Sequence, residues 1–220
     1  MYRFVVIVLL VFSLSTVAET HPTEEHDSEL LIIEQNRYGE FLVAGDVDWA
    51  GYTKVRLEKA EVTFRERWVH DQWRRSGVKV SEKDQERIKS EMSNLFDELV
   101  TRELPKESDY VMTSENGEGV IRISPRIVDL DVVVPDRSRD YIGFSLADSQ
   151  VSFSLELEIY DSVSGELLAT SRRREEDPIK GYMEWANSVS NRRAARLMLM
   201  RWVTWLTERL DEAAAGAAHQ

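Results

Sequence analysis

The chain has 220 residues, of which 42% are hydrophobic and 31% charged, the proportions of an ordinary globular protein. A chain of this length can bury about 70% of its unfolded surface, so we expect a single domain. The formal net charge of −12 argues against nucleic-acid binding, because an acidic surface repels phosphate backbones. The chain contains no cysteine, which excludes disulfides and lipid attachment through a cysteine.

The N-terminal segment has the pattern of a secretory signal peptide. Arg3 precedes an apolar run from Phe4 to Val17, and Thr16-Val17-Ala18 supplies the small residues of a cleavage site. The run is shorter than the roughly 20 apolar residues of a spanning helix, which favours cleavage over an uncleaved anchor. We therefore expect residues 1–18 to be a signal peptide cleaved after Ala18. The mature chain would be periplasmic or otherwise exported, without a transmembrane span.

The two flanks of the expected domain differ from its centre in composition. Residues 19–38 begin with an acidic stretch that has no basic residue before Leu30, which is typical of a solvated tether. Leu30-Leu31-Ile32-Ile33 forms an apolar patch in this tether; it either docks on the domain or meets a partner, and docking is favoured. Residues 212–220 are rich in alanine and predict a flexible tail. Residues 39–211 remain as one domain.

Two segments of the domain predict strands with irregularities. Residues 52–64 alternate apolar and polar positions but change phase near Lys59, which indicates a bulge or bend. Residues 119–134 are rich in Val and Ile, and Pro125 within them must lie at an edge, a bend or a bulge. The intervening residues 65–79 are polar, and we interpret them as an irregular or partly helical excursion.

Two segments predict helices. Ser81 and Asp84 are spaced like a capping box, and apolar residues at helical spacing follow until Pro105, where we expect the helix to end. Ser190 is the expected N-cap of the last helix, which covers residues 192–211. This helix is apolar over more than one stripe, so it is either deeply buried or shares a second face with a partner.

The strongest strand pattern is the strict alternation from Val151 to Ile159. A turn at Asp161-Ser162-Val163-Ser164-Gly165 and a returning strand over residues 166–174 complete a predicted hairpin. The order of elements is strand, helix, strand, strand, strand, helix. We therefore predict an α+β fold, with an antiparallel sheet of about four strands and two helices packed on one face.

Three parts of the sequence resemble a bacterial cell-envelope family catalogued as domain of unknown function 3313. They are Asp48–Val55, the hairpin at Glu156–Ala169 and the helix end at Trp202–Asp211, and the resemblance covers residues 39–211. The resemblance implies small envelope proteins, many of them lipoproteins, with no established chemistry and no catalytic residues. This chain differs from lipoprotein members in lacking the lipid-bearing cysteine.

Catalytic and metal-binding patterns are weak. Asp129 and Asp131 alternate on one strand and could act as an acid–base pair, although a solvated strand face explains them better. His21 and His26 lie among acidic residues, but a solvated tether explains this cluster better than a metal site. We therefore expect no catalytic residues, no metal and no cofactor.

These observations lead to three functional hypotheses. The favoured one is an exported soluble envelope protein that binds an unknown envelope protein or component without catalysing a reaction. The first alternative is a structural or assembly factor that self-associates as a homo-oligomer through the last helix, where the possible partner face contains Leu199, Trp202, Trp205 and Leu206. The second alternative is a hydrolase-like enzyme that uses Asp129 and Asp131.

Overall fold

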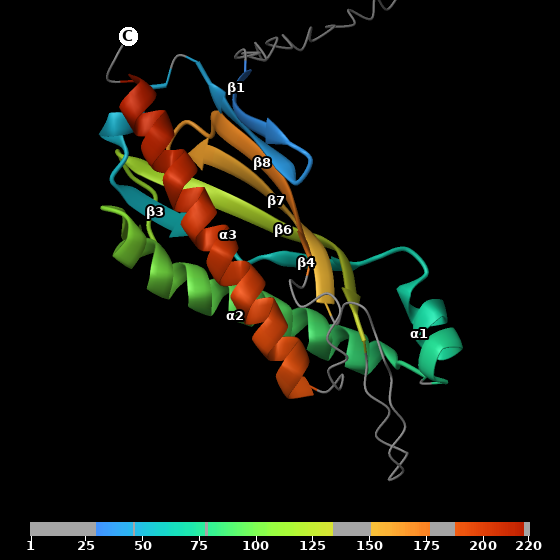
Figure 1. Ribbon diagram of the computed structural model, residues 1–220. Helices are drawn as coiled ribbons and strands as arrows, with labels where there is room; N and C mark the ends of the chain where they lie inside the picture. Colours follow the sequence, from blue (N-terminus) through green and yellow to red (C-terminus); the bar gives the residue numbers. More distant parts are fainter. Residues whose placement is uncertain (1–29, 46, 78, 134–150, 177–187, 218–220) are drawn as a thin grey trace, which may run out of the picture.

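The computed structural model describes residues 30–45, 47–77, 79–133, 151–176 and 188–217 (Figure 1). The signal-peptide and cleavage-site predictions, with His21, His26 and the end of the chain from residue 218, lie outside the described residues. In chain order the elements are β1 (Leu30–Asn36), β2 (Gly39–Ala44), the 3-10 helix η1 (Trp49–Gly51), β3 (Lys54–Leu57), β4 (Glu61–Phe64), α1 (Trp68–Ser76), α2 (Glu82–Glu107), β5 (Val111–Thr113), β6 (Val120–Val132), β7 (Val151–Asp161), β8 (Leu167–Glu176) and α3 (Ser188–Ala217).

The strands form one mixed sheet in the order β1-β2-β8-β7-β6-β3-β5, and β4 also pairs with β6. The pairings from β1 to β6 along this order are antiparallel. The pairings of β3 with β5, and of β3 and β4 with β6, are parallel. The predicted α+β class is thus confirmed, but the described sheet has eight strands rather than about four and is not purely antiparallel.

The long helices α2 and α3 lie on one face of the sheet, as predicted (Figure 1). The core fills the space between them and the sheet. Trp202 of α3 is fully buried and lies 5.4 Å from the ring of Phe96 on α2. From the sheet, Leu155 and Ile159 of β7 point into this core and are fully buried. The alternation predicted for β7, with Leu155 and Ile159 directed toward the core, is therefore confirmed. The third helix, α1, was predicted only as a partly helical excursion.

The opposite face of the sheet is polar. Register partners on successive strands place Glu61, Arg126, Glu156, Arg172 and Glu40 in one row of alternating charge from β4 to β2. Glu156 forms ion pairs with Arg126 at 3.0 Å and with Arg172 at 3.5 Å. Opposite charges directly across a strand pair stabilise a sheet. The row of paired charges makes this face of the sheet compatible with contact with water.

The irregularities predicted in the strands occur where β6 changes partner. The predicted strand over residues 52–64 is divided into β3 and β4, which confirms the bend near Lys59. β6 pairs with β3 up to Ile123 and with β4 from Arg126. The backbone carbonyl of Ile123 accepts a hydrogen bond from the Glu58 N–H, so it points toward β3 and β4. Backbone groups two residues apart in a strand point the same way, so the nitrogen of Pro125 also faces β3 and β4. Pro125 lies between the pairing with β3 and the pairing with β4, so its lack of an N–H costs no hydrogen bond of the sheet.

The helix limits differ from the sequence prediction at three ends. The Ser81–Asp84 capping box is confirmed, with the Asp84 backbone N–H donating to Ser81 Oγ at 3.2 Å. The helix passes Pro105 and ends at Glu107, because a proline only two residues from the end removes little of the ladder. α3 begins at Ser188, before the expected cap at Ser190, and continues to Ala217, so most of the expected flexible tail is helical.

The largest correction concerns the N-terminal boundary. Leu30–Asn36 form β1 and pair in register with β2, so residues that we assigned to the acidic tether belong to the sheet. The expected domain start at Gly39 is instead the first residue of β2, inside the β1–β2 hairpin. Gly39 is needed there, because a Cβ would lie 2.3 Å from the backbone oxygen of Arg172. The apolar patch at Leu30–Ile33 does dock on the domain, as a strand.

Candidate functional site

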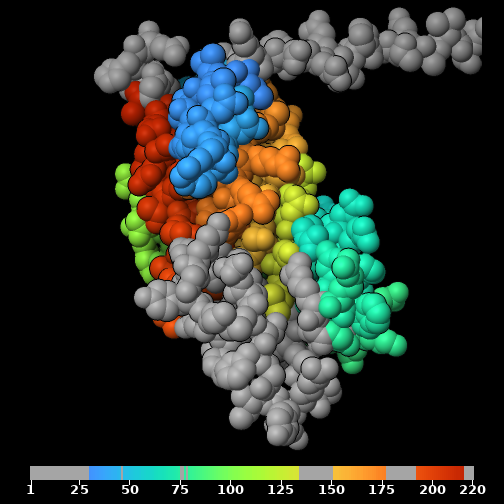
Figure 2. Space-filling view, turned by 45° about the vertical axis from the view of Figure 1, so that its right-hand side comes forward, coloured from blue at the N-terminus to red at the C-terminus, as the bar shows by residue number. Residues whose placement is uncertain are grey.

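β1 is the terminal strand of the described sheet, and its side chains combine two unlike features. Leu31, Ile32 and Ile33 are exposed by 44%, 59% and 36%. Figure 2 shows this strand and β2 on the molecular surface, coloured blue. An edge strand presents backbone N–H and C=O groups along its outer side, and apolar side chains there favour pairing with another strand. The first half of β1 is therefore a candidate contact edge.

A β-bulge divides this apolar half from a polar half. The register shifts between Ile32, which lies opposite Leu42, and Glu34, which lies opposite Phe41. Phe41 is fully buried and packs edge-on against Trp205 of α3, with ring centroids 5.8 Å apart. Glu34 shares the face of the sheet on which Phe41 lies, and so its carboxylate is directed toward α3 rather than toward solvent. A bulge that re-aims one side chain is a common feature of sheet edges.

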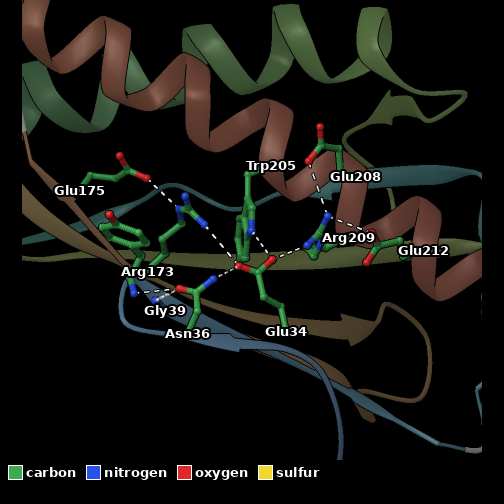
Figure 3. Close-up of polar contacts among 10 residues, drawn as sticks. Glu34, Asn36, Gly39, Arg173, Glu175, Trp205, Glu208, Arg209 and Glu212 are labelled. Carbon is green, nitrogen blue, oxygen red and sulfur yellow. Dashed lines mark hydrogen bonds and ion pairs between the residues drawn. The ribbon is translucent and has the colours of Figure 1, made fainter. Parts of the chain in front are cut away.

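The Glu34 carboxylate is the anchor that ties β1 to α3 (Figure 3). Trp205 Nε1 donates a hydrogen bond to Glu34 Oε2 at 2.9 Å, and Arg209 forms an ion pair with the same oxygen. Arg173 of β8 lies 3.8 Å from the other oxygen. We call Glu34, Arg173, Trp205 and Arg209 the Glu34 anchor. It joins the first strand, a central strand and the last helix.

Further charges complete the network around the anchor. Arg173 pairs with Glu175 at 2.9 Å and lies over the Trp205 ring, 4.8 Å from its centroid. Arg209 also pairs with Glu212 of α3 at 2.9 Å. Arg209 lies 3.6 Å from Glu208 as well, so Arg173 contacts two carboxylates and Arg209 contacts three. These ion pairs hold both guanidinium groups in position to bind the Glu34 carboxylate.

The electrostatics of the Glu34 anchor suit a structural role. Burial of Glu34 alone would raise its pKa, but the hydrogen bond from Trp205 and the positive charge of Arg209 outweigh burial. The pKa of Glu34 is therefore below its ordinary value, and the group is ionised at neutral pH. A carboxylate with low pKa that already accepts from several donors is a poor general base. Its effect is to hold β1 in place while the apolar residues before it remain exposed.

The four residues considered as a possible partner face on the last helix lie in the core of the domain. Leu199, Trp202 and Leu206 are fully buried within the domain, and Trp205 is 7% exposed. The wide apolar surface of α3 is explained by simultaneous contact with the sheet and with α2, which lies beside it. The side chains therefore belong to the core, and none of them is available to a partner in this fold.

The two aspartates considered for catalysis lie at a β-bulge in β6. Asp129 is exposed and lies in the left-handed region with φ +55°, where a bulge shifts the register between β6 and β7. Asp131 accepts a hydrogen bond from Arg65 Nε at 3.0 Å, and the same guanidinium also binds Asp71 of α1. The bulge breaks the alternation on which the prediction depended, and Asp131 instead helps to hold α1.

No group of three or more His, Cys, Asp or Glu side chains within the described residues has the arrangement of a metal site. His70 contacts Asp71, with Nδ1 3.3 Å from a carboxylate oxygen. None of the described helices is long and apolar enough to cross a lipid bilayer.

Sequence reasoning did not find the Glu34 anchor. Its members are far apart in the chain, and Glu34 is separated by 171 residues from Trp205. The one local signal was a glutamate that directly follows an apolar run, which could have indicated a strand whose charge points inward. Arg173 of the anchor also pairs locally with Glu175, and the neighbouring Arg174 pairs with Glu176.

The fold and site define a two-layer α+β protein with one polar sheet face and an apolar edge strand. The chain belongs to the family described as a protein of unknown function, DUF3313, whose model matches residues 39–204. The resemblance stated from the sequence is thereby confirmed. The matched region begins at β2 and so does not include β1. No curated protein matches the chain.

Several solved structures are similar to this chain at low identity. The PelC dodecamer from Paraburkholderia phytofirmans is 9% identical, with a TM-score of 0.35, and the match covers 70% of this chain and 87% of that one. The protein XCC0632 from Xanthomonas campestris, of family DUF330, is 9% identical with a TM-score of 0.40 and covers 74% and 85%. A putative neuraminyllactose-binding hemagglutinin homolog from Helicobacter pylori is 10% identical, with a TM-score of 0.35 and coverage of 74% and 86%.

Proposed function

We propose that this protein is an exported, non-catalytic accessory protein of the bacterial cell envelope that binds an extended apolar segment of another protein at β1. The observation that carries the proposal is the exposure of Leu31, Ile32 and Ile33 on an edge strand that is otherwise firmly attached. The signal-peptide pattern at residues 1–18 supports export. The bound segment would extend the sheet by one strand, with backbone hydrogen bonds giving affinity and apolar side chains giving selectivity.

The two halves of β1 suit this function differently. Leu30–Ile32 have a regular register with β2 and are apolar, so they provide the flat edge that an added strand needs. The bulge at Ile33 and the inward-directed Glu34 interrupt the edge, and such features protect sheets against indiscriminate pairing. The incoming segment would therefore be short and would pair with the first half of β1.

Non-catalytic action is favoured by how the polar groups are used. Glu34 is engaged with Trp205 and two arginines, and Asp131 is engaged with Arg65. Both carboxylates act as acceptors within the fold. Both carboxylates therefore have structural roles in this proposal, and an activity that disappears in Asp131→Asn with unchanged stability would contradict it.

The experiment is site-specific photocrosslinking in the bacterial envelope. A photoreactive amino acid replaces Ile32, and a matched control replaces Val163, which is 69% exposed in the β7–β8 turn. We expect a discrete adduct with another protein from position 32 and none from position 163. The adduct should disappear when Leu31→Lys is combined with the probe, because a charge on the edge opposes strand addition.

Two results would contradict the proposal. Equal adducts from positions 32 and 163 would show that capture does not depend on β1. An adduct with the mass of two copies of this chain would indicate self-association through β1 instead of binding to a different protein.

A further inference from the structure

Among the described residues, Trp68, Asp71 and Gln72 attach α1 to the body of the protein. Trp68 is 1% exposed, stacks on Phe64 with ring centroids 3.9 Å apart, and donates from Nε1 to the backbone oxygen of Val132 at 3.0 Å. Gln72, one turn later, donates to the same oxygen at 3.0 Å. Arg65 fixes the helix further by binding Asp71. The segment forms a lobe at the edge of the molecule, coloured teal in Figure 2.

The outward side of α1 exposes large apolar side chains. Val69 and Trp73 are four residues apart, so they lie on one side of the helix, and they are 39% and 55% exposed. Trp73 contrasts with Trp68 and Trp202, which are fully buried. Tryptophan has a large apolar ring with one polar N–H. It is enriched at interfaces, where the ring contacts apolar groups and the N–H contacts polar groups or water. The exposed pair therefore indicates a surface that is covered in use.

The same lobe is basic although the protein is acidic. Residues 65–79 contain five Lys and Arg against two Asp and Glu, a net charge of +3, whereas the whole chain carries −12. Arg67, Arg74 and Lys79 are exposed. Around the helix axis Arg74 follows Trp73 by one position, so a positive charge borders the exposed apolar pair. A basic and aromatic lobe on an acidic body is complementary to an anionic surface.

We propose that α1 is a membrane-surface contact that places Trp73 and Val69 in the headgroup region of a bilayer containing anionic lipids. Tryptophan is enriched at this depth, and nearby Lys and Arg are attracted by anionic headgroups. A nucleic acid or an acidic protein would satisfy the positive charges, but the exposed Val69 beside Trp73 favours an apolar environment. The acidic remainder of the surface is repelled by the same lipids, so the protein binds only with α1 toward the membrane.

The contact is weak and reversible, because it involves one short helix with two apolar side chains. It is also separate from β1, which lies at a distance from α1 in both overall views. The membrane contact therefore does not depend on the partner-binding function proposed for β1.

The test is co-sedimentation of the protein purified from the cell envelope with phosphatidylcholine vesicles, with and without phosphatidylglycerol. We expect binding only with phosphatidylglycerol, and binding roughly tenfold weaker when salt rises from about 0.05 to about 0.5 M, because salt screens the charges. Trp73→Ser and Arg74→Glu should each weaken binding roughly tenfold. The controls are Val163→Ser, at a residue 69% exposed, and Lys54→Glu, at an exposed lysine of β3; both should bind like the wild type.

Three results would overturn the inference. One is absence of binding to phosphatidylglycerol vesicles at low salt, and another is equal binding to neutral vesicles. The third is vesicle binding that the α1 variants leave unchanged. Binding of polyglutamate or single-stranded DNA that depends on Trp73 and Arg74, without vesicle binding, would assign the lobe to another class of partner. Thermal melting of each variant establishes that it is folded.

Discussion

The Glu34 anchor predicts a stability loss that depends on pH. In Glu34→Gln the side chain keeps its shape and one acceptor for Trp205, but it loses the charge that faces Arg209 and Arg173. Hydrogen bonds to charged groups contribute about 1.5–3 kcal/mol, and the Arg209 pair is mostly buried. The more distant pair with Arg173, at 3.8 Å, adds about 0.2–1 kcal/mol. We therefore expect Glu34→Gln to lower the free energy of unfolding by about 2–4 kcal/mol at pH 7.

The pH dependence follows from the direction of the shift. The pKa of Glu34 is lowered from 4.5 in the folded state, so the folded protein holds the ionised form more tightly than the unfolded chain does. This stabilisation is complete above the unfolded pKa and is lost as the pH falls through the lower folded pKa. The difference between wild type and Glu34→Gln should therefore be largest near neutrality and should shrink in acid well below pH 4.5.

Urea titrations of wild type, Glu34→Gln and Glu40→Gln at pH 7 and at an acidic pH well below 4.5 measure these differences in stability. Glu40 on neighbouring β2 contacts Gln35 at 3.5 Å on the surface, so its variant should change stability by about 0.5 kcal/mol or less. A Glu34→Gln variant as stable as the Glu40→Gln control at pH 7 would refute the assignment of Glu34 as an anchor. A loss that is the same at both pH values would refute its electrostatic basis.

Three further predictions concern the core, a close backbone approach and processing. Leu155→Ala and Leu206→Ala should each cost about 2–5 kcal/mol in denaturant titrations, because both residues are fully buried. Glu158→Ala should change stability by about 0.5 kcal/mol or less, and Glu156→Ala, which loses its ion pairs with Arg126 and Arg172, by about 1 kcal/mol or less; glutamate variants as damaging as the leucine variants would show the wrong strand phase. Gly39→Ala should cost about 1–3 kcal/mol, because its Cβ would meet the Arg172 backbone at 2.3 Å, while Gly51→Ala, whose nearest contact is at 3.9 Å, serves as the control and should unfold near the wild-type midpoint. Mass spectrometry of the exported protein should find an N-terminus at Glu19, and a form that retains Met1 would indicate an uncleaved anchor.

The elements that could be predicted are those whose signal is local. Ser81 and Asp84 define a helix start by their spacing alone, and the structure has that capping box. The hairpin of β7 and β8 follows from strict alternation around a turn with Gly165 at φ +76°. In both cases neighbouring residues in the chain are also neighbours in space, so the pattern contains the information needed.

The elements that could not be predicted depend on contacts between distant parts of the chain. β3 and β4 pair in parallel with β6, and nothing local distinguishes them from one bent strand of an antiparallel sheet. β1 is short and mostly exposed, so its sequence resembles an apolar patch in a tether. The apolar width of α3 was equally compatible with a partner face and with burial, and only its position beside both α2 and the sheet decides for burial.

The proposed contact edge requires β1 to be an ordered strand whose outer edge is open at Leu30–Ile32. Residue-resolved amide hydrogen exchange measures this property, because in an antiparallel pair alternate residues direct their N–H toward the partner strand. We predict that alternate amides of β1 are protected by β2 while the intervening amides exchange rapidly. Rapid exchange of every β1 amide would show that the strand is not part of the sheet. Uniform protection would show that its outer edge is already covered, and either result would contradict the proposed contact edge.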